Sequence, residues 1–450
     1  MNILVKDKLF YKTFFSMTIL VAMQNLITFS VGLADNIMIG GYDQMALSGV
    51  AIVNQIQFLL QMLMNGICSG IMVLGAQYWG KKQTEPIRKV TSIGVNLAIA
   101  TGLLMMVLVT VFPSQILHML CNDEVVIEQG MKYLRIVSFS YIFFSIGSVL
   151  LGALRAVETV KIGFFVNLTA LFVNIFLNYG LIYGKLGMPE LGTEGAALAT
   201  LTSRIVEFLI ITVYVLFFDK KIRWKPSGLM HMDSILLQDY IRIGLPCVLS
   251  SGLWGIATSV QTAILGRLGA DTIAANSIAV TLFQVVSVVL YASANSTGVM
   301  IGKTVGTGEL STLRTQVRTF QILFLCIGLF TGLWMYSLKD LIIGLYSITP
   351  ETAALTAQFI LILSVSVIFS AYQMPVLNGI VTGGGDTRFV LINDFVSQWI
   401  VVLPLSFASA FLFHWPLWVT FLCLKSDQFF KCIVAVVKVN RYRWVRVLTR

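Results

Sequence analysis

The sequence predicts an all-α integral membrane protein built from two similar halves. Three observations support this prediction: an apolar composition, a series of long apolar runs, and an internal repeat. Of the 450 residues, 57% are hydrophobic and 12% are charged, whereas soluble domains average about 25% charged residues. Such a composition does not cover a water-facing surface. The runs show no alternation of polar and apolar residues, which argues against a transmembrane β-barrel.

A helix that spans a bilayer needs about 20 consecutive, mostly apolar residues. Twelve runs of the chain satisfy this requirement, and we expect each to form one transmembrane helix. Their approximate extents are 13–39, 46–77, 90–112, 130–153, 161–184, 195–217, 241–265, 273–301, 316–338, 354–379, 389–413 and 416–437.

Basic residues gather in every second connection between these runs. The second connection carries Lys81, Lys82, Arg88 and Lys89, and the longest polar stretch, 219–239, carries four more. Because cytoplasmic loops are enriched in Lys and Arg, this bias predicts a multi-pass inner-membrane protein with both termini in the cytoplasm. That orientation requires an even number of spans, in agreement with twelve. The net charge of +10 is thus explained by loops and does not indicate nucleic acid binding.

The two halves of the chain resemble each other at a nearly constant offset. Six spans in each half give both halves the same orientation, so an axis along the membrane normal should relate them, as in alternating-access transporters. We therefore expect an N-terminal six-helix lobe at 1–218, a cytoplasmic linker at 219–240 and a C-terminal six-helix lobe at 241–450. The matched pairs are Gly40 with Gly266, Gly80 with Gly306, Arg88 with Arg314, and Glu158-Thr159 with Asp386-Thr387.

Asp35 is an acid near the end of the first apolar run, in the stretch VGLADNIMIGG. Ionisable residues inside a membrane are costly and commonly functional. The functional interpretation is a carboxylate that alternately holds a cation and a substrate. The alternative is an acid near the lipid headgroups that merely ends a helix. The equivalent segment of the second half, QTAILGRLG, has no acid.

Amide side chains repeat at helical spacing in the fifth run. Asn167, Asn174 and Asn178 are separated by seven and four residues, which places them on one helical face. In the first run, Asn25 and Thr28 share a face with Asp35 by the same spacing. A polar stripe within a membrane must face protein or water. It lines a site or forms hydrogen bonds between helices, and the sequence leaves both interpretations open.

Other polar residues in the runs are further candidates. Arg204 and Glu207 are three residues apart and can neutralise each other, which favours a structural ion pair over a proton relay. Asp394, with Gln398 one turn later, is a weaker candidate. Four amides of the second run follow helical spacing and either line the central cleft or hold helices together: Asn54, Gln57, Gln61 and Asn65.

Several classes of function lack their sequence signals. No GxxxxGK[ST] motif occurs, which argues against an ATP-driven pump. No Ser–His–Asp or zinc pattern occurs, so we do not expect an enzyme or a cofactor. Six cysteines form no CxxC pair, and three histidines lie far apart. The one metal ion that we consider is Na⁺, which Asp35 would bind if sodium were the coupling ion.

The chain resembles the multidrug and toxic compound extrusion (MATE) family over nearly its whole length. The resemblance implies twelve helices in two six-helix lobes with a V shape, and export of organic, often cationic and aromatic compounds driven by inward sodium or proton flow. Asp35 and Asn174 stand at positions of a family aspartate and asparagine, Asn178 where some members have a second aspartate, and Thr200 near a helix-six threonine. The matching segments, in chain order, are ADNIMIGG, ALSGVA, QYWG, LRAVET, LNYGLIYGKLGMPELGTEGAALAT, IGLP, ILGRLGADTIAANSIA, IGKTVGTGE and VTGGGDT.

The chain departs from the family pattern at three places. Trp254 and Ala371 stand near the positions where some members have an acidic pair in the second lobe, so a second-lobe cation site at those positions is not expected. Asn178 leaves Asp35 without a partner acid on the fifth helix. Leu20 stands where many members have a proline in the first helix, although Pro246 keeps the equivalent residue in the second half.

These observations favour a secondary antiporter that exports small organic compounds in exchange for H⁺ or Na⁺, working as a monomer in contact with membrane lipid. Asp35 would be the coupling residue. An alternative is a related flippase for lipid-linked oligosaccharides, which would be expected to line its cleft with several basic residues. A non-transporting receptor or scaffold is a third class, and the internal repeat argues against it.

Overall fold

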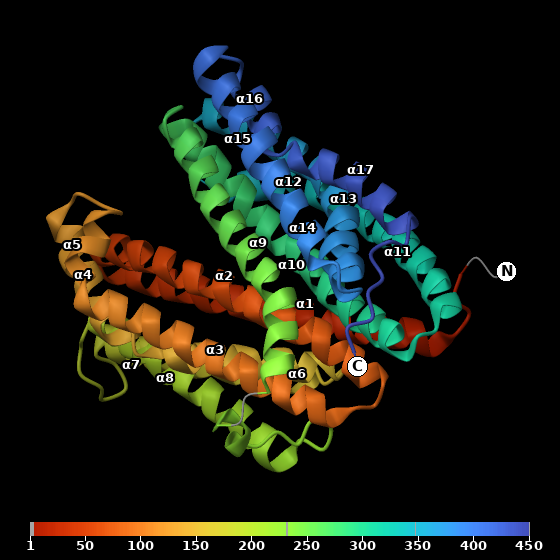
Figure 1. Cartoon of the computed structure of the whole chain (residues 1–450). Coiled ribbons are helices and arrows are strands. Elements are labelled where there is room, and N and C mark those ends of the chain that lie inside the picture. Colours follow the sequence, from red (N-terminus) through yellow and green to blue (C-terminus); the bar gives the residue numbers. More distant parts are fainter. Residues whose placement is uncertain (1–3, 231–232, 347, 450) are drawn as a thin grey trace. The chain divides into compact units, whose positions relative to one another are not determined.

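The computed structural model describes residues 4–230, 233–346 and 348–449, and the regular elements in these ranges are helices without a strand (Figure 1). The chain divides into two compact units. We call Met23–Val248 the N-terminal unit, and Met1–Ala22 together with Leu249–Arg450 the C-terminal unit. Two long helices, α1 and α9, each contribute to both units. The predicted lobe limits at 218 and 240 stay a prediction.

Long helices build the N-terminal unit, with α2 packed on α3, α5 and α6, and α7 packed on α8. Three short elements accompany them: α4, a π-helical turn η1 and a 3-10 turn η2. In chain order the elements are α1 (Lys8–Tyr42), α2 (Gln44–Gly80), α3 (Thr84–Val111), α4 (Pro113–His118), α5 (Glu124–Val137), α6 (Ser140–Ala156), α7 (Lys161–Tyr183), α8 (Thr193–Val213), η1 (Tyr214–Phe218), η2 (Pro226–Met230) and α9 (Ser234–Gly266).

In the C-terminal unit, α13 packs on α10, α11 and α17. Three π-helical segments, η3, η4 and η5, interrupt its later helices. The elements are α10 (Ala270–Thr307), α11 (Leu310–Ser337), α12 (Lys339–Ile343), α13 (Pro350–Met374), η3 (Pro375–Val381), α14 (Thr387–Phe395), η4 (Val396–Val402), α15 (Leu403–Phe407), η5 (Ala408–Leu412), α16 (Leu417–Leu424) and α17 (Asp427–Asn440).

The predicted all-α membrane fold is confirmed. Within the described ranges, ten helices are long and apolar enough to cross a membrane, and α5 with α6, bent by 55°, forms an eleventh candidate. These correspond in order to the first eleven predicted runs. The twelfth run, 416–437, forms the two shorter helices α16 and α17, separated at Lys425 and Ser426. At 8 and 14 residues, neither helix is long enough to cross a membrane alone.

Local sequence signals explain several helix ends. Asp43 begins α2, and its carboxylate accepts a hydrogen bond from the Ala46 amide at 2.8 Å, as a short polar side chain does at an N-cap. Thr349 does the same for α13, directly before Pro350, a residue that suits the first helical position. Gly184 ends α7 with φ of 64°, a left-handed conformation that costs glycine little.

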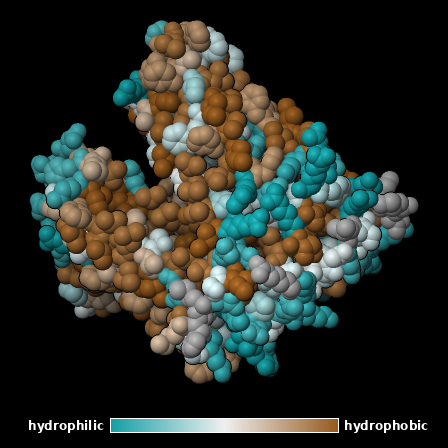
Figure 2. Space-filling model, in the orientation of Figure 1, coloured by the Kyte–Doolittle hydropathy of each residue, from teal (hydrophilic) through white to brown (hydrophobic). Residues whose placement is uncertain are grey.

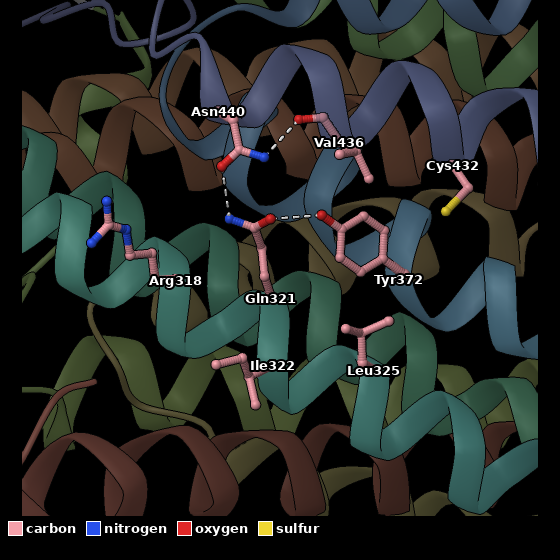
Figure 3. A pocket seen from close by; sticks show the side chains of 8 residues that line it. All are labelled: Arg318, Gln321, Ile322, Leu325, Tyr372, Cys432, Val436 and Asn440. Carbon is pink, nitrogen blue, oxygen red and sulfur yellow. Dashed lines mark hydrogen bonds between the residues drawn. The ribbon is translucent and has the colours of Figure 1, made fainter. Parts of the chain in front are cut away.

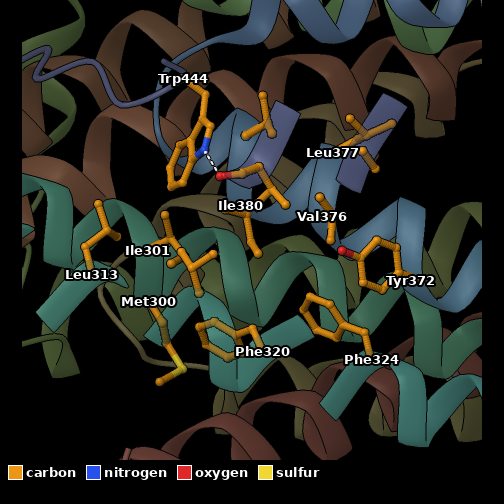
Figure 4. Packing of buried hydrophobic residues seen from close by; sticks show 14 of the residues in the cluster. Met300, Ile301, Leu313, Phe320, Phe324, Tyr372, Val376, Leu377, Ile380 and Trp444 are labelled. Atoms are coloured by element: carbon orange, nitrogen blue, oxygen red, sulfur yellow. Dashed lines mark hydrogen bonds between the residues drawn. The ribbon is translucent and has the colours of Figure 1, made fainter. Parts of the chain in front are cut away.

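Apolar side chains both fill the helix interfaces and cover the outside. Figure 2 shows hydrophobic residues over the upper, left and central parts of the face in view, whereas hydrophilic residues gather at its lower right. The hydrophobic area is expected for a surface in contact with lipid. Inside the C-terminal unit, aromatic and aliphatic residues of α1, α10, α11, α13 and η3 form one cluster (Figure 4). Trp444, from the segment after α17, is completely buried in it. Trp444 therefore belongs to the core of this unit.

Candidate functional site

Asp35 in α1 meets the asparagine face of α7. The Asn178 amide nitrogen donates a hydrogen bond to Asp35 Oδ1 at 2.5 Å, and the same nitrogen lies 3.2 Å from Asn174 Oδ1. The exposed fraction of Asp35 is 8%, and both asparagines are fully buried. The spacing of four residues brings the two amides to one side of α7. The predicted face thus carries hydrogen bonds directly to the predicted acid.

Two further elements close the surroundings of Asp35. Thr200 of α8 is near the Asp35 carboxyl, and its hydroxyl lies 3.4 Å from the Tyr133 hydroxyl of α5. Gln57 of α2 contacts Tyr133 in turn. The structure therefore gathers the polar side chains of Asp35, Thr200 and Gln57 in one region of the N-terminal unit. We call Asp35, Asn174, Asn178, Thr200, Tyr133 and Gln57 the Asp35 cluster.

Three polar atoms of the Asp35 cluster are buried without a hydrogen-bond partner. They are Gln57 Nε2, Asn174 Nδ2 and Asn178 Oδ1. Buried polar groups of this kind are rare and call for an explanation. The Asn178 oxygen belongs to the same amide whose nitrogen donates to the Asp35 carboxylate. An anionic oxygen and a spare amide oxygen together are a suitable ligand set for a small cation.

A second polar layer lies nearer the beginning of α7. The Asn167 amide is 3.3 Å from the Thr28 hydroxyl, and Thr28 donates to the Gln24 carbonyl at 3.0 Å. The Gln24 side chain, which the sequence analysis did not select, accepts from Arg155 at 2.9 Å and donates to the Val160 carbonyl at 2.8 Å. Thr28 therefore connects α1 to α7 and does not belong to the Asp35 cluster.

The remaining predicted residues of this unit divide into two groups. Arg204 and Glu207 form an ion pair of 2.8 Å, and Arg204 also lies 5.0 Å from the Phe144 ring centre. This pair links two turns of α8, the helix that also carries Thr200. Asn25 and Gln61 are half-buried and lie outside the hydrogen bonds described above.

Asp394 belongs to a charged network in the C-terminal unit that sequence analysis largely missed. Its carboxylate forms an ion pair of 2.9 Å with Lys431 Nζ, and the same ammonium lies 3.7 Å from the Asp427 carboxylate. Asp427 also accepts from Gln398 at 2.7 Å. Asp427 and Lys431 fall inside the last apolar run, which was read as a plain span. The sequence signal that could have predicted this network was an acid and a base four residues apart in that run.

A surface pocket of the C-terminal unit lies apart from these polar clusters. It has a volume of about 400 Å³ and lies between α11 and α17 (Figure 3). At its polar end, Gln321 accepts from the Tyr372 hydroxyl at 2.7 Å and approaches Asn440 at 3.5 Å. The remaining lining is mostly apolar. None of the predicted site residues lines this pocket.

Comparison with known proteins settles the family. The MatE family model matches residues 21–180 and 246–408. The chain belongs to the MatE family. The two matched segments begin 225 residues apart and end 228 residues apart, which agrees with the offsets of the internal repeat. The predicted membership of the MATE efflux transporters is therefore confirmed for both halves.

Relatives of the same family cover almost the full chain. The probable multidrug resistance protein NorM of Thermotoga maritima is 26% identical over 430 residues, covering 95% of this chain and 92% of the relative. The fold is similar to a Vibrio cholerae MATE transporter, VcmN, with a TM-score of 0.87, 18% identity and coverage of 97% and 98% of the two chains. A Pyrococcus furiosus transporter of the MOP superfamily gives the same TM-score and identity, with coverage of 98% and 97%.

Proposed function

We propose that this MatE-family protein is a secondary antiporter that exports organic cations in exchange for H⁺ or Na⁺, with Asp35 as the coupling residue. The observation that carries the proposal is the direct contact between a buried carboxylate and the Asn178 amide. A carboxylate held among amides and hydroxyls within a membrane helix bundle can be neutralised by one cation at a time. Binding of the coupling ion and of a cationic substrate then exclude each other.

The chemistry of the Asp35 cluster supports a cation as ligand. Asp35 supplies the negative charge, and the amide that donates to it, that of Asn178, has a spare oxygen. Tyr133 adds an aromatic ring to the cluster, and aromatic rings attract organic cations. The printed name of the Thermotoga maritima relative, a probable multidrug resistance protein, also favours export of varied organic compounds. The MatE match argues against the lipid-linked oligosaccharide flippase.

The decisive experiment is efflux of ethidium, a fluorescent organic cation, in everted membrane vesicles. We expect Asp35→Asn to abolish ion-driven ethidium uptake into the vesicles, because the amide keeps the shape and loses the charge. Glu128→Gln is the matched control, since Glu128 is in the same unit, exposed, and paired with Lys132. Wild-type rates with normal ion dependence in Asp35→Asn would contradict the proposal.

Two arms of the same assay separate the coupling ions. One arm imposes a pH gradient without sodium, and the other imposes a sodium gradient at equal pH. The arm that drives uptake identifies the ion. Sodium, if it is the ion, would be held by the Asp35 carboxylate and the Asn178 oxygen.

We further propose that the protein acts as a monomer with both termini in the cytoplasm. The basic residues of the even-numbered connections support this orientation. A reporter enzyme fused after Arg450 that is active only in the cytoplasm tests it, and an inactive, well-expressed fusion would contradict it. The molar mass of the purified protein in detergent, measured by light scattering, tests the monomer.

A further inference from the structure

The surface pocket between α11 and α17 has one basic, polar end and one apolar end. Arg318, at the basic end, lies near the beginning of α11, and Leu325 lies two helical turns further along the same helix. Asn440, at the end of α17, approaches Gln321 at 3.5 Å. Figure 3 shows Arg318 and Asn440 toward one end of the pocket, with Leu325 and Cys432 toward the other. The lining therefore changes from polar to apolar over about 10 Å of helix length.

Two guanidinium groups give the basic end its charge. Arg314 and Arg318 are four residues apart, which places them on one side of the first turns of α11. Both side chains are exposed, and neither forms an ion pair within the part of the chain that the structure describes. Arg314 lies 5.5 Å from the Tyr442 ring centre. Asp386, the acid that contacts the last turn of α17, is already shared by two bases. This end of the pocket therefore has an excess of positive charge.

The amide groups at this end use their oxygens in contacts within the protein and keep spare N–H donors. The Gln321 oxygen accepts from the Tyr372 hydroxyl at 2.7 Å, and the Gln321 nitrogen lies 3.5 Å from the Asn440 oxygen. The Asn440 nitrogen donates to the Val436 carbonyl at 2.9 Å. Each amide nitrogen thus uses one of its two hydrogens in these contacts, and the Arg318 guanidinium has five N–H donors. Positive charge with spare donors suits an anion that has several acceptor oxygens, such as a phosphate group.

The rest of the pocket suits a hydrocarbon chain. Ile322 and Leu325 of α11 and Val436 of α17 line it, and all three side chains are exposed. Ile322 and Leu325 follow Arg318 by four and seven residues, so they lie on the same face of α11 as the guanidinium. Arg318 is near the start of the predicted membrane run 316–338. The apolar part of the pocket therefore extends from the membrane surface toward the hydrocarbon layer, as a phospholipid does.

We propose that this pocket binds an anionic phospholipid of the surrounding membrane, with its phosphate at Arg318 and one acyl chain along Ile322, Leu325 and Val436. Basic pockets between transmembrane helices bind anionic lipid headgroups by the same chemistry. The positive charge argues against an organic cation, the proposed substrate, as the occupant. In the proposed orientation the lipid belongs to the cytoplasmic leaflet. Its binding does not depend on the antiport function or on Asp35.

Titration with two lipids of equal chain length tests the charge. Native mass spectrometry of the purified full-length protein in detergent counts the bound molecules of dioleoyl phosphatidylglycerol, which is anionic, and of dioleoyl phosphatidylcholine, which has no net charge. We expect the wild type to bind its first phosphatidylglycerol at least tenfold more tightly, and Arg318→Gln to lose about tenfold in affinity for phosphatidylglycerol alone.

The matched control for charge is Arg388→Gln. Arg388 is an exposed arginine of the same unit, at the beginning of α14 and outside the pocket. It should bind phosphatidylglycerol as the wild type does. Equal losses in Arg318→Gln and Arg388→Gln would overturn the proposal, because they would show a general attraction between basic residues and anionic lipid.

A second pair of variants tests the apolar part of the pocket. Leu325→Trp fills the space of the acyl chain and should lower the affinity for phosphatidylglycerol by about tenfold. Leu333→Trp makes the same change on α11 outside the pocket, at a side chain that is 68% exposed, and should bind as wild type. A loss in Arg318→Gln without a loss in Leu325→Trp would overturn the proposal, since a headgroup held at the surface alone explains that result. A dimer in the wild-type spectrum that Leu325→Trp removes would also overturn it, in favour of a second copy of the chain as the occupant.

Discussion

The Asn178 amide donates a hydrogen bond to the Asp35 carboxylate across 143 positions of the chain. This contact joins the only acid of the first apolar run to a residue of the fifth. The amide nitrogen is committed to Asp35, whereas the amide oxygen is buried without a hydrogen-bond partner. In the proposed mechanism, Asn178 therefore stabilises the negative charge of Asp35 and offers a neutral oxygen ligand to the coupling cation.

Removing the Asn178 amide should alter the affinity for the coupling ion. In Asn178→Ala the carboxylate loses a hydrogen bond to its charged form, worth about 1.5–3 kcal/mol, so a proton should bind more tightly and leave more slowly. We expect the KM for the proton to fall by about tenfold or more and the maximal ethidium efflux rate to drop. Asn167→Ala is the matched control, because Asn167 contacts Thr28 and not Asp35. An unchanged KM in Asn178→Ala would remove Asn178 from the mechanism.

Close packing of α7 on α8 depends on Gly195. A Cβ at this position would lie 2.4 Å from the Leu181 carbonyl oxygen, and backbone atoms cannot yield as a flexible side chain can. Gly195→Ala should therefore destabilise the protein by about 1–3 kcal/mol. Thermal unfolding in detergent measures the loss. Gly252→Ala, in α9 with nothing near the added methyl group, should leave the melting temperature equal or slightly higher, and the reverse order would contradict this account.

Local patterns were sufficient to predict most of the fold. The length of the apolar runs identified eleven spans, because each helix that crosses a bilayer needs its own long apolar run. Helical spacing placed Asn174 and Asn178 on one face because it is a property of a single helix. Tyr133 was not predicted as part of the Asp35 cluster, since its contact with Thr200 depends on how α5 meets α8. Local patterns do not contain that information.

The network around Lys431 shows a second limit of prediction from the sequence. Asp427 and Lys431 lie one helical turn apart in a run whose mean hydropathy is that of an apolar segment. Averaging the hydropathy over a window hides such a charged pair. Their burial and their contact with Asp394 appear only when α17 packs on α13 and η4. The same holds for Gln24 and Arg155, which are 131 positions apart. When the partner of a charged group is remote in the sequence, the sequence alone does not predict their contact.

The segment after α17 is predicted to be held by Trp444 and Asp386. Asp386, of the TGGGDT segment, forms ion pairs with Lys438 at 2.7 Å and Arg446 at 2.8 Å. Trp444 packs against Gly384 so closely that a Cβ there has no room. Trp444→Ala should cost about 3–5 kcal/mol and speed tryptic cleavage at Arg443. Trp418→Ala is the control, since Trp418 is 46% exposed. Equal cleavage rates in both variants would show that Trp444 does not anchor the segment.

The beginning of α9 should depend on pH through Asp233. Hydrogen bonds from the Leu236 backbone amide and from the Lys89 ammonium, at 3.2 Å and 3.3 Å, lower the pKa of Asp233 below its usual value of 3.8. A lowered folded-state pKa means that the stabilisation is complete above the unfolded-state pKa and is lost as pH falls through the folded-state pKa. We therefore expect hydrogen exchange in the first turn of α9 to be slow at neutral pH and to show added opening below about pH 4. Asp233→Asn should remove this pH step, and a step of the same size in that variant would assign it to another group.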